Sequence, residues 1–169
     1  MQSRGRSITP RDEHRRRQDA GEEPRSLLLA EVLGADLLDE EALNEVGPLR
    51  ARVYRRLPSF VAQAVEARLS ASRYDIVLSW SERHSVALAV LFTLAPSRTK
   101  HVTMTSLMSK PSVGWPYRLF RRGITHIITW SSVQQQVAVG LGYGRGRVSY
   151  VPHPVDCRFY TPGDCCTDR

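Results

Sequence analysis

The stretch YDIVLSWSERHSVALAVLFTLAPSRTKHVTMT, residues 74–105, decides the fold. It begins with an apolar strand pattern (74–80), continues into a long apolar segment with helical spacing (81–95) and ends with a second strand pattern (100–105). No hairpin signal separates the first strand from the helix, and strands that are apolar on both faces are typical of parallel sheets covered by helices. The stretch therefore predicts a β–α–β unit.

The same alternation continues downstream. Residues 124–129, 131–142 and 147–151 have the patterns of a strand, a helix and a strand, and a further helix is expected around 117–122. Upstream, we expect a helix that ends at Gly34, a short strand at 35–39, and a helical region at 49–70 with a break at Pro58. The sequence thus predicts an α/β fold, a Rossmann-like parallel sheet flanked by helices, over residues 25–151.

Charge and composition limit the functions that the chain can have. The 169 residues are 41% hydrophobic and 24% charged, and the formal net charge is +7. Residues 1–24 are polar and basic, and we expect them to be flexible. No Asp or Glu lies between Glu82 and Asp156, so this half of the domain should attract an anionic ligand or surface. The cysteines lack the spacing of a metal site, and we expect neither a metal nor a cofactor.

The helix starts point to a binding edge. Ser79 with Glu82, and Ser131 with Gln134, fit the S-x-x-E/Q capping box at points where a strand passes into a helix. In a parallel sheet these points meet at the carboxyl edge, where exposed N–H groups and helix dipoles favour anions. The cleft or acceptor-binding candidates are Glu82, Arg83, Thr105, Ser106, Lys110, Ser131 and Ser132. Helix capping alone would also explain Glu82 and Ser131, and it is the favoured reading for both.

The run from ITHIITWSS to RFYTP, residues 124–162, resembles the last βαβ unit in the amino-terminal domain of family-4 glycosyltransferases with GT-B architecture. The similarity extends back, less sharply, to about residue 25. It is carried by Ser131 and Ser132, the glycine-containing turn 140–146, the strand and proline at 148–152, Val155 with Asp156, Phe159 and Pro162.

This resemblance implies that the chain is the acceptor-side half of a glycosyltransferase, which moves a sugar from a nucleotide-sugar to an anionic or glycan acceptor. Residues 152–169, with Pro152, Pro154 and Asp156, would form the linker to a second domain that this sequence lacks. That domain would hold the nucleotide-sugar donor, so the resemblance implies either a fragment or a degenerate copy, without activity of its own. Family members often carry a histidine where Thr105 and Ser106 stand, so no catalytic residue is assigned and the question of enzyme activity stays open.

A non-catalytic α/β module that binds a phosphorylated ligand or a partner protein is the alternative, since it explains the basic half equally well. Nucleic acid is not expected as a partner because the basic residues are dispersed and no recognition motif accompanies them.

The segment WPYRLFRRG, residues 115–123, is a candidate for a second binding surface. Aromatic and basic residues alternate there, as in helices that lie on anionic membranes, and the candidates are Trp115, Tyr117, Arg118, Arg121 and Arg122. The alternative is an ordinary amphipathic helix packed on the sheet, which is favoured because the segment is short for independent membrane binding. Without a signal peptide or a membrane-spanning run, we expect a cytoplasmic protein, with a peripheral contact on the inner face of the membrane as the second reading.

Overall fold

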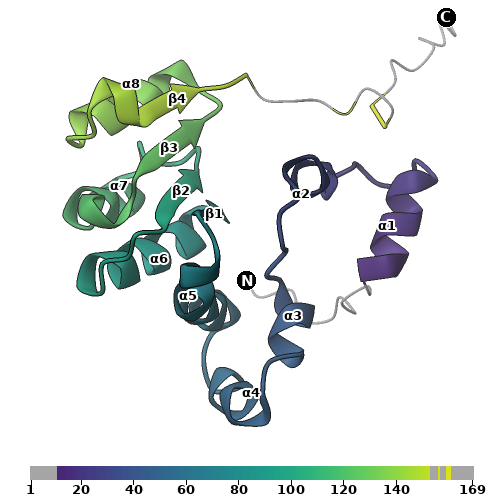
Figure 1. Ribbon diagram of the computed structural model, residues 1–169. Helices are drawn as coiled ribbons and strands as arrows, with labels where there is room; N and C mark the ends of the chain where they lie inside the picture. The colour runs from purple at the N-terminus through teal and green to yellow at the C-terminus, as the bar shows by residue number, and fades with distance from the viewer. Residues whose placement is uncertain (1–10, 153–155, 157–158, 161–169) are drawn as a thin grey trace, which may run out of the picture. The chain divides into compact units, whose positions relative to one another are not determined.

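The computed structural model describes residues 11–152, 156, 159 and 160 (Figure 1). These residues form two units. One runs from Leu38 to Pro152, and the other combines the described residues up to Leu37 with Asp156, Phe159 and Tyr160. No helix of the described residues is both long and apolar enough to cross a bilayer.

A four-stranded, all-parallel sheet organises the larger unit, as the sequence predicted. The strands are β1 (Ile76–Trp80), β2 (Lys100–Met104), β3 (His126–Thr129) and β4 (Val148–Tyr150), and they lie in this order across the sheet. The crossovers contain α6 (Glu82–Leu94), α7 (Pro111–Leu119) and α8 (Ser132–Gly140), with the short 3₁₀ turns η2 (Arg121–Gly123) and η3 (Arg145–Arg147) before β3 and β4. The expected helix at 117–122 is therefore replaced by a longer helix that begins at Pro111.

The three crossover helices pack on the same face of the sheet (Figure 1). The core there joins Ile127 and Val148 of the sheet to Ala89 of α6, Tyr117 of α7 and Ala138 of α8. Alternate side chains point to the opposite face, which is much more open: Trp80 is 51% exposed, and its ring lies 5.7 Å from that of Trp130. The larger unit is therefore a Rossmann-like α/β fold, a parallel sheet flanked by helices, as the sequence predicted, and its three crossover helices share one face of the sheet.

Helices α3 (Glu40–Asn44), α4 (Pro48–Tyr54) and α5 (Ser59–Ser70) precede the sheet, and the 3₁₀ turn η1 (Ala71–Arg73) leads into β1. Pro58 separates α4 from α5, as predicted. The predicted strand at 35–39 is wrong: the Asp39 carboxylate accepts a hydrogen bond from the Ala42 backbone and begins α3 instead. The side chains of Ala64 on α5 and of Leu88 and Phe92 on α6 form a second small core.

The smaller unit contains α1 (Arg11–Asp19) and α2 (Leu28–Leu33). Gly34 ends α2 with φ 59°, which confirms the predicted helix end. Of the polar segment at 1–24, residues 1–10 lie outside the described residues, and residues 11–19 form α1, whose Gln18 side chain is buried and hydrogen-bonds the Ser26 hydroxyl. Residues 25–37 belong to this unit, and the sheet unit begins at Leu38.

Candidate functional site

The carboxyl ends of β1 and β2 are joined by Glu82, the first residue of α6. Its Oε1 atom accepts a hydrogen bond from the Thr105 hydroxyl and another from the backbone N–H of Ser106, both at 3.2 Å. The Thr105 N–H donates to Ile128 O at 3.0 Å, which extends the pairing of β2 with β3 up to this point. Three of the predicted cleft residues therefore lie together at the carboxyl edge, and the carboxylate of Glu82 is half-buried there.

A second connection lies one strand further along the same edge. The backbone N–H of Ser109 donates to Gln134 Oε1 at 3.0 Å, and Gln134 Nε2 donates to the Ser109 hydroxyl at 2.7 Å. This pair ties the loop after β2 to the first turn of α8. Sequence reasoning missed Ser109, because only the tertiary structure brings it opposite Gln134.

Neither predicted capping box forms. Ser131 is the first residue before α8, but its side chain makes no capping hydrogen bond, and Gln134 is engaged by Ser109. Ser79 lies inside β1, where its hydroxyl hydrogen-bonds inward, and Ser81 is the residue that precedes α6. The sequence pattern located the helix starts, but other side chains compete for the groups that a capping box needs.

The remaining predicted residues flank the carboxyl edge without meeting Glu82. Arg83 is exposed in the first turn of α6, and Ser132 is exposed in the first turn of α8. Lys110 precedes α7, and its carbonyl accepts the Gly114 N–H at 2.8 Å while its side chain is exposed. Among the described residues, Arg83 and Lys110 are therefore cations that border the edge from two helix starts.

Ser81, His84 and Gln63 form a chain of hydrogen bonds that the sequence did not reveal. The Ser81 hydroxyl lies 2.7 Å from His84 Nδ1, and His84 Nε2 lies 2.5 Å from Gln63 Oε1 on α5. Because an amide oxygen can only accept, Nε2 carries the proton and Nδ1 accepts from Ser81. Burial lowers the pKa of His84 below its usual 6.5, which keeps the ring neutral. Ser81 itself has φ 112°, a conformation rare outside glycine.

His101 is a buried structural residue below the carboxyl edge. Its Nδ1 donates to Gly123 O at 2.8 Å, and its Nε2 lies 2.9 Å from the Ser79 hydroxyl, which in turn lies 2.9 Å from the Ser85 hydroxyl. Ser85 also hydrogen-bonds Thr103. Burial lowers the pKa of His101 to about 4, so the ring is neutral near pH 7 and links β1, β2 and α6.

Tyr117 is not part of a membrane-facing surface. Its side chain is fully buried in the core between α7 and the sheet, and this burial raises its pKa. Helical geometry explains the correction, since residues two apart on a helix point in different directions. The other four candidates of that segment, Trp115, Arg118, Arg121 and Arg122, are exposed.

The predicted linker residues have separate positions. Pro152 is exposed after β4, and Pro154 lies outside the described residues. The carboxylate of Asp156 accepts from the backbone N–H of Arg25 at 3.0 Å and from its guanidinium at 3.2 Å. Asp156 therefore pairs with a residue 131 positions earlier, an ion pair that no local pattern could show.

The described residues contain no group of three or more His, Cys, Asp or Glu side chains placed to hold a metal ion. The chain matches no protein-family model, no curated protein and no solved structure. The carboxyl edge thus offers an oriented carboxylate, hydroxyl groups and two flanking cations, which suits a polar ligand bound by hydrogen bonds.

Proposed function

We propose that residues 38–152 bind the acceptor of a sugar-transfer reaction at the carboxyl edge of the sheet. The observation that carries the proposal is the fixed carboxylate of Glu82. Both of its hydrogen bonds from Thr105 and Ser106 go to Oε1, so Oε2 can accept a hydrogen bond from a ligand hydroxyl. A charged acceptor held in one orientation makes stronger hydrogen bonds than a neutral one, and sugars present many hydroxyl donors.

The fold and the terminal motif support the same proposal. Glu82 and Ser131 lie where β1 and β3 pass into α6 and α8, and exposed N–H groups at such helix starts can bind polar ligands. The run 124–162 resembles the region of family-4 glycosyltransferases that precedes their donor-binding domain. In this proposal residues 38–152 hold the acceptor, and a donor-binding domain of that kind would hold the nucleotide-sugar.

The test is a titration of the full ¹⁵N-labelled chain with a panel of neutral mono- and disaccharides, followed by NMR. We expect the amide signals of Glu82, Thr105 and Ser106 to shift. Glu82→Gln should weaken binding about tenfold, because a hydrogen bond to a charged group is replaced by a neutral one. Arg73→Gln, at the other end of β1, is the matched control and should leave the affinity unchanged. Sugar binding that Glu82→Gln leaves unaffected would contradict the proposal.

A non-catalytic module for a phosphorylated ligand is the second candidate, favoured by the exposed cations Arg83 and Lys110 at the same edge. The two candidates respond to Glu82→Gln in opposite directions. Removal of the carboxylate should weaken the binding of a neutral sugar, whereas it should strengthen the binding of a sugar phosphate by removing a like charge. A parallel titration with glucose and glucose 6-phosphate therefore separates them.

A further inference from the structure

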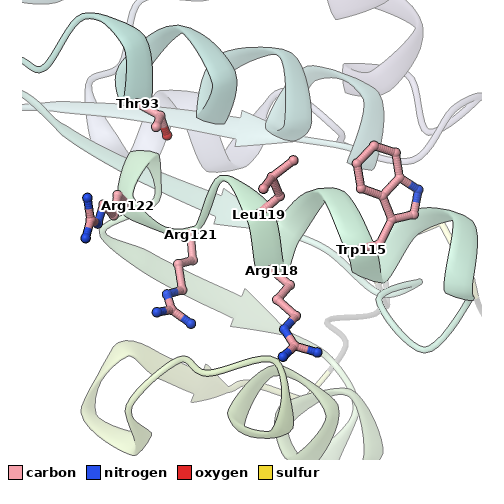
Figure 2. A pocket seen from close by; sticks show the side chains of 6 residues that line it. All are labelled: Thr93, Trp115, Arg118, Leu119, Arg121 and Arg122. Carbon is pink, nitrogen blue, oxygen red and sulfur yellow. The ribbon is translucent and has the colours of Figure 1, made fainter.

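A row of side chains on the outer surface of α7 and η2 combines large apolar groups with arginines. The row consists of Trp115, Arg118, Leu119, Arg121 and Arg122, called here the α7 row. Trp115 is 61% exposed and Leu119 is 62% exposed, four residues apart on one face of the helix. Together with Thr93 of α6 they border a shallow hollow of about 580 Å³, in which Arg118 and Arg121 reach to one side of α7 and Trp115 and Leu119 to the other (Figure 2).

The backbone below the row is held firmly by the core. Tyr117 and Pro116 are buried on the inner side of α7. Gly123 approaches α6 so closely that a Cβ atom there would lie 2.0 Å from Ala89 O. Helix α7 has only nine residues, which is short for a helix that must fold on a membrane. Since the tertiary structure already fixes it, binding through the α7 row would not require the helix to be ordered first.

The charge of the α7 row is unopposed. The sequence has no Asp or Glu from residue 83 to residue 155, and within the described residues no carboxylate forms an ion pair with Arg118, Arg121 or Arg122. Arg50, by contrast, pairs with Glu66 at 3.1 Å. Three arginines around two exposed apolar side chains therefore form a surface that complements negative charge and also has groups to place in an apolar medium.

We propose that the α7 row docks on an anionic lipid bilayer. Trp115 and Leu119 enter the boundary between headgroups and acyl chains, and the three arginines contact lipid phosphates. The exposed Leu119 favours a bilayer over a nucleic acid, because a leucine gains contacts among acyl chains and offers neither hydrogen bonds to bases nor charge to the backbone. This inference does not depend on the ligand bound at the carboxyl edge.

Helix α4 and the residues after it have a similar set of exposed apolar and basic side chains, and therefore provide a matched control for the α7 row. Leu49, Arg52, Val53 and Arg56 repeat the same exposed spacing there, and Arg55 is exposed beside them. That helix, however, contacts α3, which carries Glu40 and Glu41, and it lies near Glu66. These carboxylates lower the positive potential around α4. The same number of charges and a comparable apolar pair can thus be removed from each helix.

The experiment is co-sedimentation of the full chain with vesicles of equal parts phosphatidylcholine and phosphatidylglycerol at low salt. A triple variant with Arg118→Gln, Arg121→Gln and Arg122→Gln should bind the vesicles about a hundredfold more weakly. Each arginine near an anionic surface contributes about fivefold to the binding constant. Trp115→Ala with Leu119→Ala should weaken it about tenfold or more. Two control variants carry the matching changes near α4: one combines Arg52→Gln, Arg55→Gln and Arg56→Gln, and the other combines Leu49→Ala and Val53→Ala. Each should change vesicle binding about threefold or less. Far-ultraviolet circular dichroism confirms that each variant is folded.

The insertion of Trp115 into the bilayer can be measured separately, by tryptophan fluorescence. Brominated lipids should quench tryptophan fluorescence in the wild-type chain and in Trp80→Phe, and quench it far less in Trp115→Phe. The proposal is overturned by any of three results: no sedimentation with the anionic vesicles, loss of binding in the α4 sets as large as in the α7 sets, or tighter binding to a duplex oligonucleotide that the α7 variants weaken equally.

Discussion

The Oε1 atom of Glu82 lies 3.2 Å from the backbone nitrogen of Ser106, so the first turn of α6 is tied to the loop that follows β2. The same oxygen accepts from the Thr105 hydroxyl. One carboxylate therefore satisfies a backbone and a side-chain donor that come from another strand end. This arrangement holds two neighbouring parts of the carboxyl edge in register and orients the candidate ligand-binding group.

Glu82→Ala should lower the free energy of unfolding by about 1–2 kcal/mol, because two partly buried donors lose their acceptor. Glu82→Gln keeps an oxygen at this position and should cost less than about 1 kcal/mol. Urea denaturation followed by circular dichroism measures both values. Arg83→Gln, the neighbouring exposed residue, serves as control and should stay within about 0.5 kcal/mol of wild type. Equal stabilities of Glu82→Ala and Arg83→Gln would show that the contact contributes nothing.

Gly123→Ala should destabilise the fold by about 2–3 kcal/mol or more, because the added Cβ would lie 2.0 Å from Ala89 O and force α6 and η2 apart. The change affects the contact between η2 and α6 that lies below the α7 row. Gly146→Ala is the control: a Cβ there meets no atom within 4 Å, and we expect a shift within about 1 kcal/mol. Thermal and urea unfolding of the two variants provide the comparison, and similar losses in both would contradict the close approach at Gly123.

The stability of the protein should fall as the pH is lowered from about 6.5 to about 4, because burial lowers the pKa of His101 from 6.5 to about 4. Between these values the unfolded chain binds a proton at His101 and the folded chain does not, so protonation favours unfolding. The stabilisation is complete above pH 6.5 and is lost as the pH falls, by about 3 kcal/mol over the whole interval.

His101→Gln separates this contribution from other titrating groups. The variant should be less stable than wild type at pH 7, since the imidazole contacts with Ser79 and Gly123 are lost. Its stability should nevertheless depend less steeply on pH between 6.5 and 4. Urea unfolding at several pH values measures both slopes. Parallel pH profiles for the two proteins would mean that His101 titrates normally in the folded state.

Asp156→Ala should speed the exchange of the Arg25 backbone amide hydrogen about tenfold, because that N–H donates to the Asp156 carboxylate. Amide hydrogen exchange followed by NMR reads this site directly. Asp19→Ala removes an exposed carboxylate of the same unit and should leave the Arg25 rate unchanged. An unchanged rate in Asp156→Ala would show that the pair does not form in solution.

Sequence patterns correctly predicted those helices and strands whose formation depends on neighbouring residues in the chain. The strands at β1 to β4, the helix end at Gly34 and the break at Pro58 all follow from apolar spacing, a left-handed glycine or a fixed proline φ. The prediction of a short strand at 35–39 (ADLLD) is wrong. There the Asp39 side chain satisfies the first turn of α3, and this hydrogen bond outweighs a weak strand preference.

The sequence by itself determined the parallel α/β unit and the positive charge of its second half, because hydrophobic period and charge are properties of short stretches. Only the tertiary structure decided that Glu82 meets Thr105 and Ser106, that Gln134 turns to Ser109, and that Tyr117 points inward while Trp115 points outward. Each of these depends on which strand ends become neighbours and which side of a helix the core takes. Those choices are made by packing between residues far apart in the chain, and no local spacing encodes them.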